Sequence, residues 1–417
     1  MKQLLVIGNG FDLQCGLKSN YNDFFSERFK EVFDIDDFKD CKRAACKITN
    51  YIEKNGFMYE GLNKKIDYFH GYKLKRKKEG IEITRWDCFF LFSQVFLEDT
   101  NNLQWQGVEN IIYNVVSIAL DPSFESNLEF KHNSESDDTE KEKYYKAINY
   151  LSTIGDNSPD TIATELLNDL NQFEEIFADY IVKQVLNNRN FQDFYPNLLS
   201  RLIKNLDQTE EEKPVNVDVI SFNYSLTLPF KEKFNRDHGD KVHILSWSNI
   251  HGVAFFKDSA AEQAVLQSIS YVSGFHLPAP IFGIDNHDIL SDGKQDDPRI
   301  IFTKSFRLID NNVNIIRDDM SYENIDLITI YGHSLARADY SYFETIFDNC
   351  DIYSSKTKLE FYYHPGDHAQ LEKRKAVRKV VNLLTDYGNT LDGRHGENIV
   401  NKMILENRLQ VIDSTTL

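Results

Sequence analysis

The chain has 417 residues, of which 41% are hydrophobic, enough to bury a large core in two domains or in one domain with a long insertion. Its 47 Lys and Arg residues and 65 Asp and Glu residues give a formal charge of −18. Broad binding to nucleic acid or to an anionic membrane needs a basic face, so this balance argues against both. It remains compatible with an anionic small molecule held locally by backbone dipoles.

Cysteine usage and hydropathy favour a soluble protein of the cytoplasm. The five cysteines are scattered without a CxxC pair, which is typical of reduced thiols. The most apolar run, Cys88 to Leu97, is too short to span a bilayer, and the opening segment is too short for a signal peptide. No metal site is expected, because no His or acidic cluster has convincing metal-ligand spacing.

The chain opens with an apolar strand, Leu4 to Ile7, which runs directly into Gly8-Asn9-Gly10-Phe11-Asp12. A strand, a glycine-rich turn and a helix start are the arrangement that directs backbone N–H groups at a phosphate in α/β proteins. The segment therefore predicts a nucleotide site. A tight turn without a ligand is the open alternative, because Leu13 stands where G-x-G-x-x-G requires a glycine.

Roughly two hundred residues separate this strand from the next, and most of their apolar residues recur at helical spacing. The pattern is regular from Leu166 to Tyr180 and less regular from Trp105 to Ile112. We expect the polar segment His132–Lys146 to form a surface loop or helix linker, and Asp207–Pro214 to form an acidic connector. Residues 31–210 are thus predicted to be a mainly helical insertion.

Four later segments are also apolar and rich in β-branched or aromatic residues: Val215–Ile220, Val242–Leu245, Asp326–Tyr331 and Leu359–Tyr363. Near-continuous hydrophobicity is typical of parallel strands that helices cover on both faces. We therefore predict an α/β fold with a doubly wound, mainly parallel, Rossmann-like sheet. This domain comprises residues 1–30 and 211–417, and the helical insertion interrupts it.

Two polar residues follow predicted strands, where side chains of a parallel sheet line the usual ligand crevice. Asn223 has the donor and the acceptor needed to orient a water or a ribose hydroxyl. His251 precedes Gly252, and histidine titrates near neutrality as a general base should. Taken singly, each is more often a structural residue, so their catalytic role depends on their sharing one crevice.

The segment Gly332-His333-Ser334-Leu335, with Asp339 shortly after it, follows another predicted strand. A glycine and a serine at a helix start can hold a second phosphate or a ribose. The alternative without a ligand is an ordinary strand-to-helix turn that Ser334 caps.

A third interpretation of this segment is a degraded G-x-S-x-G nucleophile elbow. Ser334 would then attack an acyl carbon, with His364 or His368 as the base and Asp348 or Asp351 as its orienter. Ala336 replaces the second glycine of that motif, which weakens the interpretation.

Together these segments resemble the AbiH family of bacterial abortive-infection proteins, which act against phage. The resemblance rests on ordered landmarks from the start of the chain to about residue 340. They are Leu4–Leu13, Gly16-Leu17, Tyr21-x-Asp23-Phe24, Ser221–Tyr224, Ile250–Gly252, Ile281–Asp285, and Tyr331–Leu335 with Asp339.

The same landmarks are similar to those of sirtuin-type NAD-binding domains, which implies a sirtuin-like fold and NAD as substrate or ligand. The resemblance matches Asn223 and His251 to residues that flank the nicotinamide ribose, and so implies that they are catalytic. It places cofactor-binding residues at both glycine turns: Gly8, Asn9, Gly10, Phe11, Asp12, Gly332, His333, Ser334 and Asp339.

Two departures from the sirtuin pattern bear on function. Asp12 replaces a serine, and a carboxylate repels pyrophosphate unless it bonds ribose or caps the helix. The four-cysteine zinc module of deacetylases is absent, so the resemblance implies an NAD+ glycohydrolase that acts in phage defence and answers to a phage-derived trigger. The alternatives are a non-catalytic nucleotide sensor or scaffold for a phage or host partner, and the Ser334 hydrolase. The oligomeric state stays open.

Overall fold

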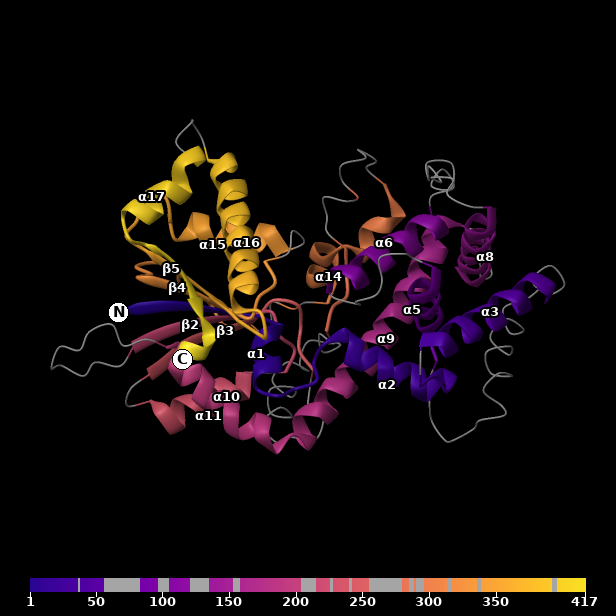
Figure 1. Ribbon diagram of the computed structural model, residues 1–417, viewed down its shortest axis with the longest axis horizontal. Helices are drawn as coiled ribbons and strands as arrows, with labels where there is room; N and C mark the ends of the chain where they lie inside the picture. Colours follow the sequence, from indigo (N-terminus) through magenta and orange to yellow (C-terminus); the bar gives the residue numbers. More distant parts are fainter. Residues whose placement is uncertain are drawn as a thin grey trace. The chain divides into compact units, whose positions relative to one another are not determined.

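The computed structural model (Figure 1) describes residues 1–36, 38–55, 83–96, 105–120, 135–152, 158–203, 215–225, 228–239, 242–254, 280–284, 289, 296–311, 313, 317–335, 339–391 and 396–417. The chain divides into two compact units. Unit 1 consists of Met1–Ser19, Ala178–Pro280 and Asn311–Leu417, and unit 2 of Asn20–Phe177 and Ile281–Asp310.

Unit 1 is built on a six-stranded sheet in which all neighbouring strands are parallel. The strand order is β3-β2-β1-β4-β5-β6. The strands are β1 (Lys2–Ile7), β2 (Val215–Ser221), β3 (Val242–Asn249), β4 (Leu327–Tyr331), β5 (Lys358–Tyr363) and β6 (Leu409–Asp413). The α/β class, the parallel sheet and the five predicted strands are confirmed, whereas β6 was not predicted.

The central strand β1 aligns the ends of its neighbours. Its residues Leu4 to Ile7 are fully buried, as expected for a strand covered on both faces. Ile7 lies opposite both Ser221 of β2 and Tyr331 of β4, and Ser221 lies opposite Asn249 of β3. The segments that follow these four strands therefore start next to one another at one edge of the sheet.

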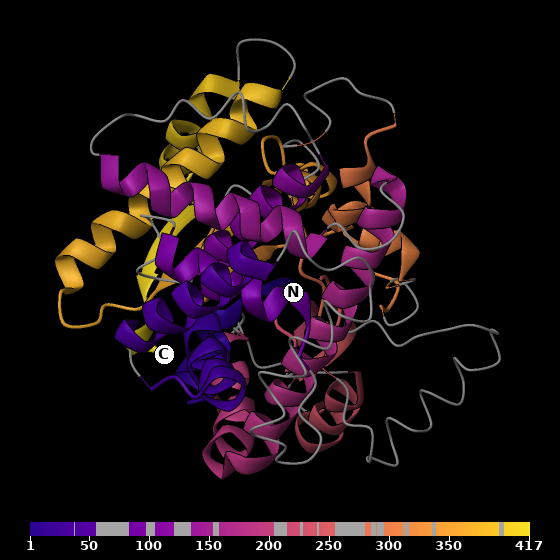
Figure 2. The same ribbon diagram turned by 90° about the vertical axis from the view of Figure 1, so that its right-hand side faces the viewer.

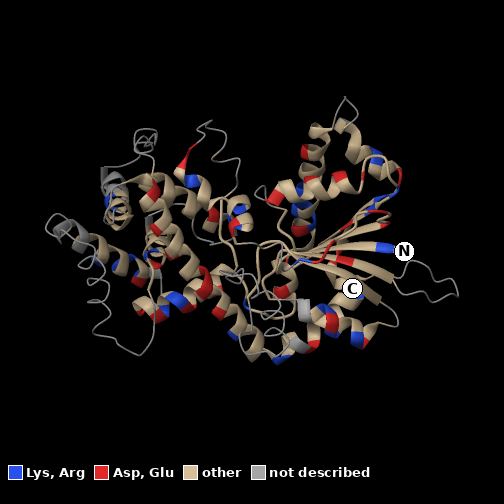
Figure 3. Cartoon of the chain, turned by 180° about the vertical axis from the view of Figure 1, so that it is seen from behind, with Lys and Arg blue, Asp and Glu red and all other residues tan. Residues whose placement is uncertain are grey.

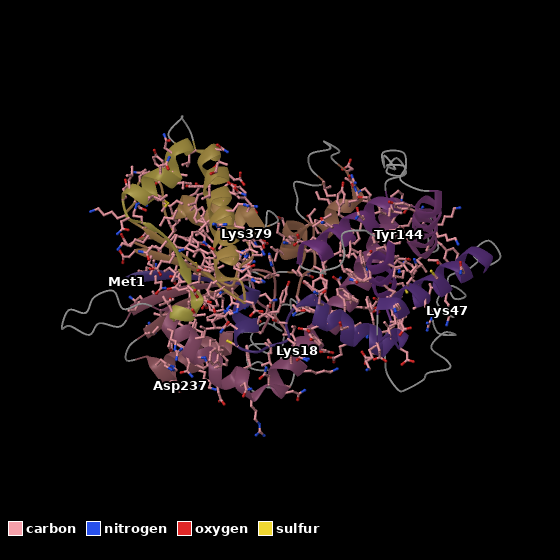
Figure 4. All side chains as sticks on the ribbon, viewed as in Figure 1. Met1, Lys18, Lys47, Tyr144, Asp237 and Lys379 are labelled. Carbon is pink, nitrogen blue, oxygen red and sulfur yellow. The ribbon has the colours of Figure 1, made fainter. Side chains whose placement is uncertain are left out.

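Helices cover both faces of this sheet (Figure 1). One face carries α15 (Tyr340–Asn349), α16 (Ala369–Thr390) and α17 (Ile399–Leu405), which pack on Leu4 and Val6 of β1. The other carries α10 (Arg189–Leu202) and α11 (Leu228–His238), and Gln3 Nε2 donates to the last carbonyl of α10 over 3.0 Å. In Figure 4, the label Lys379 marks α16 in one helical layer, and the label Asp237 marks α11 in the other.

Unit 2 is helical, with its helices packed side by side (Figure 2). It contains α2 (Tyr21–Phe33), α3 (Phe38–Asn55), α5 (Arg85–Phe96), α6 (Trp105–Leu120), α8 (Glu135–Ser152), most of α9 (Pro159–Asn187), the 3-10 helix η1 (Pro298–Phe302) and α14 (Lys304–Asp310). The helices predicted from periodicity, in α6 and α9, are confirmed. None of the described helices is both long and apolar enough to cross a membrane.

One local prediction within unit 2 is wrong. The segment His132–Lys146 was expected to be a loop or linker, yet α8 begins at Glu135. Tyr144, Ala147, Ile148 and Leu151 are buried at three- and four-residue spacing, and this stripe stabilises a helix whose first half is highly charged. The predicted connector Asp207–Pro214 lies outside the described residues.

The core of unit 2 combines aromatic rings with buried ion pairs. Phe173 contacts Phe90 and Phe282 at centroid separations of 5.0 and 6.1 Å. The Arg307 guanidinium donates hydrogen bonds to the Glu174 carboxylate. It also donates to the Phe282 carbonyl over 2.6 Å. These contacts join residues 281–310 to α9 across a long stretch of sequence. Acidic side chains are scattered over the elements of both units (Figure 3).

Candidate functional site

The candidate site lies at the carboxyl edge of the sheet of unit 1, after β1, β2, β3 and β4. The strand order reverses between β1 and β4, because β2 and β3 lie on one side of β1 whereas β4, β5 and β6 lie on the other. In open α/β sheets, ligands bind in the crevice at such a reversal. The topology therefore brings the four predicted segments to the position where a ligand is expected.

The two glycine turns pack directly on each other. The Gly8 N–H donates to the Tyr331 carbonyl over 2.9 Å, and the Gly10 N–H donates to the Gly332 carbonyl over 2.8 Å. A β-carbon on Gly10 would lie 2.6 Å from the α-carbon of Gly332, so neither turn has room for a side chain. The glycines are thus needed for backbone packing, and the amides of Gly8 and Gly10 bond protein carbonyls. Phosphate binding at these turns stays a prediction.

Asp12 lies in the short helix α1 (Asn9–Gln14). Its side chain is buried and faces the loop that follows β2. Its Oδ1 accepts from Asn223 Nδ2 over 3.0 Å and from Ser225 Oγ over 2.8 Å. Burial raises the pKa of Asp12 to about 7, although both hydrogen bonds act to lower it. This carboxyl can therefore change its charge close to neutral pH.

Asn223 is held on both its backbone and its side chain. Its N–H donates to Ser221 Oγ over 3.2 Å, and its carbonyl accepts from Asn249 Nδ2 over 3.0 Å. Because Nδ2 donates to Asp12, the other amide atom, Oδ1, is the acceptor that this residue presents. Among the described residues Oδ1 has no hydrogen-bond partner, so a donor such as a ligand hydroxyl would satisfy it.

His251 belongs to a second group, which is centred on Asp339. Asp339 Oδ1 lies 3.7 Å from His251 Nε2, and Asp339 Oδ2 lies 3.3 Å from His333 Nε2. The Leu335 N–H donates to His333 Nδ1 over 2.9 Å, so the proton of a neutral His333 ring is on Nε2 and faces the carboxylate. One buried carboxylate thus faces two imidazoles.

Phe222 connects the two groups. Its ring packs against His251 and His333 at centroid separations of 5.4 and 4.4 Å, and the next residue, Asn223, bonds Asp12. Asn223 and His251 therefore follow neighbouring strands but belong to different groups, one on Asp12 and one on Asp339. Their joint action on one ligand stays a prediction.

The remaining residues predicted to bind a cofactor take part in local contacts or face solvent. The Asn9 side chain accepts a hydrogen bond from Ser19 Oγ, and the Phe11 ring packs edge-on against Tyr331 at 6.1 Å. Ser334 is exposed. Among the described residues, neither the Asn9 nor the Ser334 side chain forms a hydrogen bond with the Asp12 or Asp339 carboxyl.

The nucleophile-elbow interpretation of Ser334 gains no support. The left-handed positions of this turn are Gly332, at φ +68°, and Leu335, at φ 53°, whereas an elbow strains the nucleophile itself. Of the proposed orienters, Asp348 accepts from Tyr387 OH over 3.0 Å and Asp351 accepts from the Ser354 N–H over 3.2 Å. Both carboxylates are thus engaged in their own local structure.

Sequence reasoning missed three residues that shape the site: Ser225, Asn249 and Arg317. The first two stand within two residues of predicted site residues, in the SFNYS and SNIHG segments, so their proximity was a usable signal. Arg317 had no such signal. Its guanidinium donates to the carbonyls of Asn249 and Ile250 over 3.1 and 2.8 Å, and so fixes the backbone immediately before His251.

No group of His, Cys, Asp and Glu in the described ranges is arranged to hold a metal ion. The family model described as bacteriophage abortive infection AbiH matches residues 4–363 of the chain. That span contains most of β1, all of β2 to β5, and the groups around Asp12 and Asp339. A comparison with curated proteins found no match.

Proposed function

Because the chain belongs to the bacteriophage abortive infection AbiH family, we propose that it is a phage-defence effector that binds NAD+ or a related nucleotide and hydrolyses the nicotinamide–ribose bond. Membership in the family implies the role in abortive infection. The nucleotide and the reaction are inferred from the carboxyl edge of unit 1.

The single observation that carries the proposal is the convergence of Asp12, Asn223, His251 and His333 after four adjacent parallel strands. The strand order β3-β2-β1-β4-β5-β6 supports the proposal, because doubly wound sheets of the Rossmann type with this order bind dinucleotides at the point of reversal. The similarity to sirtuin-type domains favours NAD among such ligands, since Asn223 and His251 match residues that flank its nicotinamide ribose.

The chemistry requires little acid catalysis. Breaking the nicotinamide–ribose bond leaves the bonding pair on the nicotinamide nitrogen and an oxocarbenium-like centre on the ribosyl carbon. Nicotinamide starts as a cation and departs neutral, so it needs no proton. A water molecule then forms the new C–O bond and loses its proton, which gives ADP-ribose.

The residues of the site have the properties that this reaction needs. Asn223 Oδ1 is a fixed acceptor that can orient a ribose hydroxyl or the attacking water. His251 takes up the proton of that water as a general base. Asp339, which lies 3.7 Å from His251 Nε2, orients the ring and stabilises its protonated form.

The proposal is tested by incubating the purified protein with NAD+, with and without phage lysate, and measuring free nicotinamide. Asn223→Ala is compared with Asn216→Ala, which changes an exposed asparagine of β2, the strand that precedes Asn223. We expect release by the parent protein and by Asn216→Ala, and strongly reduced release by Asn223→Ala. Binding of NAD+ without release in either condition would favour the non-catalytic sensor, and absence of binding would contradict the proposal.

A further inference from the structure

Several other buried carboxylates among the described residues lie against basic side chains, whereas Glu360 accepts a hydrogen bond from the Tyr362 hydroxyl. In unit 2, Asp87 accepts from Arg28 over 2.7 Å, Asp297 accepts from Arg299 over 2.6 Å, and Glu174 pairs with Arg307. In unit 1, Asp218 lies 3.1 Å from Lys2 Nζ, and Asp339 lies between two histidines. Burial of an ionised carboxylate is costly without a cation, so these pairings are expected.

Asp12 differs from this pattern. It is as deeply buried as the paired acids, yet its two hydrogen-bond donors, Asn223 and Ser225, are neutral. Within the described ranges it forms no ion pair. The titratable group beside it on its own segment is the Cys15 thiol, whose pKa is raised by burial and by the charge of Asp12. Across the site, His251 and His333 lie against the other carboxylate, Asp339.

An acid at this position is not required by its hydrogen bonds. An asparagine or serine side chain accepts hydrogen bonds from an amide and a hydroxyl without carrying a charge into the core. Retaining a carboxyl here costs stability, because the residues that the structure describes supply no counter-charge to it. A carboxyl at this position is expected if the positive counter-charge is carried by the bound ligand.

We propose that Asp12 is the counter-charge for a cation that the ligand brings, so that the site selects an oxidised nicotinamide nucleotide over its reduced form. This inference rests on the proposed function, because it requires a nucleotide at the carboxyl edge. NAD+ and NADH have the same phosphates and riboses and differ in the positive charge of the nicotinamide ring. An opposite charge within about 4–6 Å favours the ionised carboxyl without direct contact.

The same charge acts during the reaction. As the bond to nicotinamide breaks, the positive charge moves from the ring to the ribosyl carbon. A fixed negative charge close by stabilises that centre, and it does so more strongly in a buried site than in bulk water. Asp12 therefore favours both the oxidised ligand and the cationic intermediate, while it would oppose a pyrophosphate placed against it.

A measurable consequence is the release of a proton when the ligand binds. Asp12 is partly protonated near neutral pH, and a bound cation drives it to the ionised form. Calorimetric titration at pH 7 in PIPES and in imidazole, which have different ionisation enthalpies, measures this proton. The ligands are NADH and carba-NAD+, which keeps the cationic ring but resists hydrolysis.

The parent protein should bind carba-NAD+ about 10-fold or more tightly than NADH and release a measurable fraction of a proton. Asp12→Asn should bind both ligands with similar affinity and release no proton. Ser225→Ala removes a hydrogen bond to Asp12 but leaves its ionisable carboxyl, so it should keep the preference for the cation. Asp12→Ser replaces Asp12→Asn if the latter does not fold.

Three outcomes would overturn the inference. Equal affinity of the parent protein for the two ligands, or a preference for carba-NAD+ that survives in Asp12→Asn, would remove Asp12 as the counter-charge and leave nucleotide binding intact. Failure to bind either ligand would overturn the proposed function and this inference with it.

Discussion

Gly10 and Gly332 meet backbone to backbone, with the Gly10 N–H bonded to the Gly332 carbonyl over 2.8 Å. A β-carbon on either residue would lie less than 3 Å from backbone atoms of the other turn, at 2.6 Å for Gly10 and 2.5 Å for Gly332. The loops after β1 and β4 therefore have a fixed separation, and the positions of Asp12 and His333 depend on it.

Replacement of Gly10 by alanine should destabilise unit 1 by about 1–3 kcal/mol, because the new methyl group collides with backbone that cannot move independently. The matched control is Gly366→Ala, where φ is +51° but a β-carbon would meet nothing within 4 Å. That control carries only the cost of the left-handed backbone, about 1–2 kcal/mol. Urea denaturation followed by circular dichroism measures both, and equal losses would mean that the close contact is unimportant.

His251→Ala should lower the turnover of NAD+ by about 10²–10⁴-fold, the usual contribution of a positioned general base. Binding should change little, because the base acts on water. His243→Ala serves as the control, since His243 is an exposed histidine of β3, the strand that precedes His251. Nicotinamide release under saturating NAD+ gives the comparison, and equal turnover by the two variants would exclude His251 from the mechanism.

Asp339→Asn should reduce kcat about 10–100-fold with little change in KM, because an amide orients His251 but does not stabilise its protonated form. The acidic limb of the pH–rate profile should move to lower pH, since a nearby carboxylate favours a protonated imidazole. Asp319→Asn, an exposed carboxylate of unit 1, is the control. An unchanged profile in Asp339→Asn would restrict Asp339 to a structural role.

The raised pKa of Asp12 predicts a pH dependence of stability. The folded protein keeps the proton up to about pH 7, whereas the unfolded chain loses it near 3.8, so stability falls as pH rises through this window. The Asp12→Asn variant has no carboxyl at this position, so its stability does not fall with pH for this reason. Its stability relative to the parent protein should increase by on the order of 4 kcal/mol between pH 4 and pH 7. Urea titrations across the window provide the test, and a constant difference would contradict it.

Removal of Arg307 should cost about 3–5 kcal/mol, because Glu174 would remain buried without its cation. Arg307→Leu combined with Glu174→Leu should cost less than Arg307→Leu alone, since no charge is then left in the core. The exposed pair of Lys375 and Glu372 is the control, and Lys375→Ala should change stability little. A double variant as unstable as the single one would mean that packing, not charge, dominates at this position.

The sequence by itself determined the elements whose signal is local. Strands such as Leu4–Ile7 are buried on both faces and are therefore continuously apolar, and α9 has a regular apolar stripe. β6 escaped prediction because its residues are only half-buried, so LQVID has no clear apolar pattern. Charged residues likewise hid the stripe of α8.

The sequence also indicated which loops would form the site, because the carboxyl ends of parallel strands meet at one edge. Only the tertiary structure decided the partners there. Asp12 bonds Asn223 across 211 positions of sequence, Asp339 lies between His251 and His333, and Arg307 finds Glu174 in the other segment of its unit. Hydrogen bonds and ion pairs depend on distances of a few tenths of an ångström, which packing sets and residue order does not encode locally.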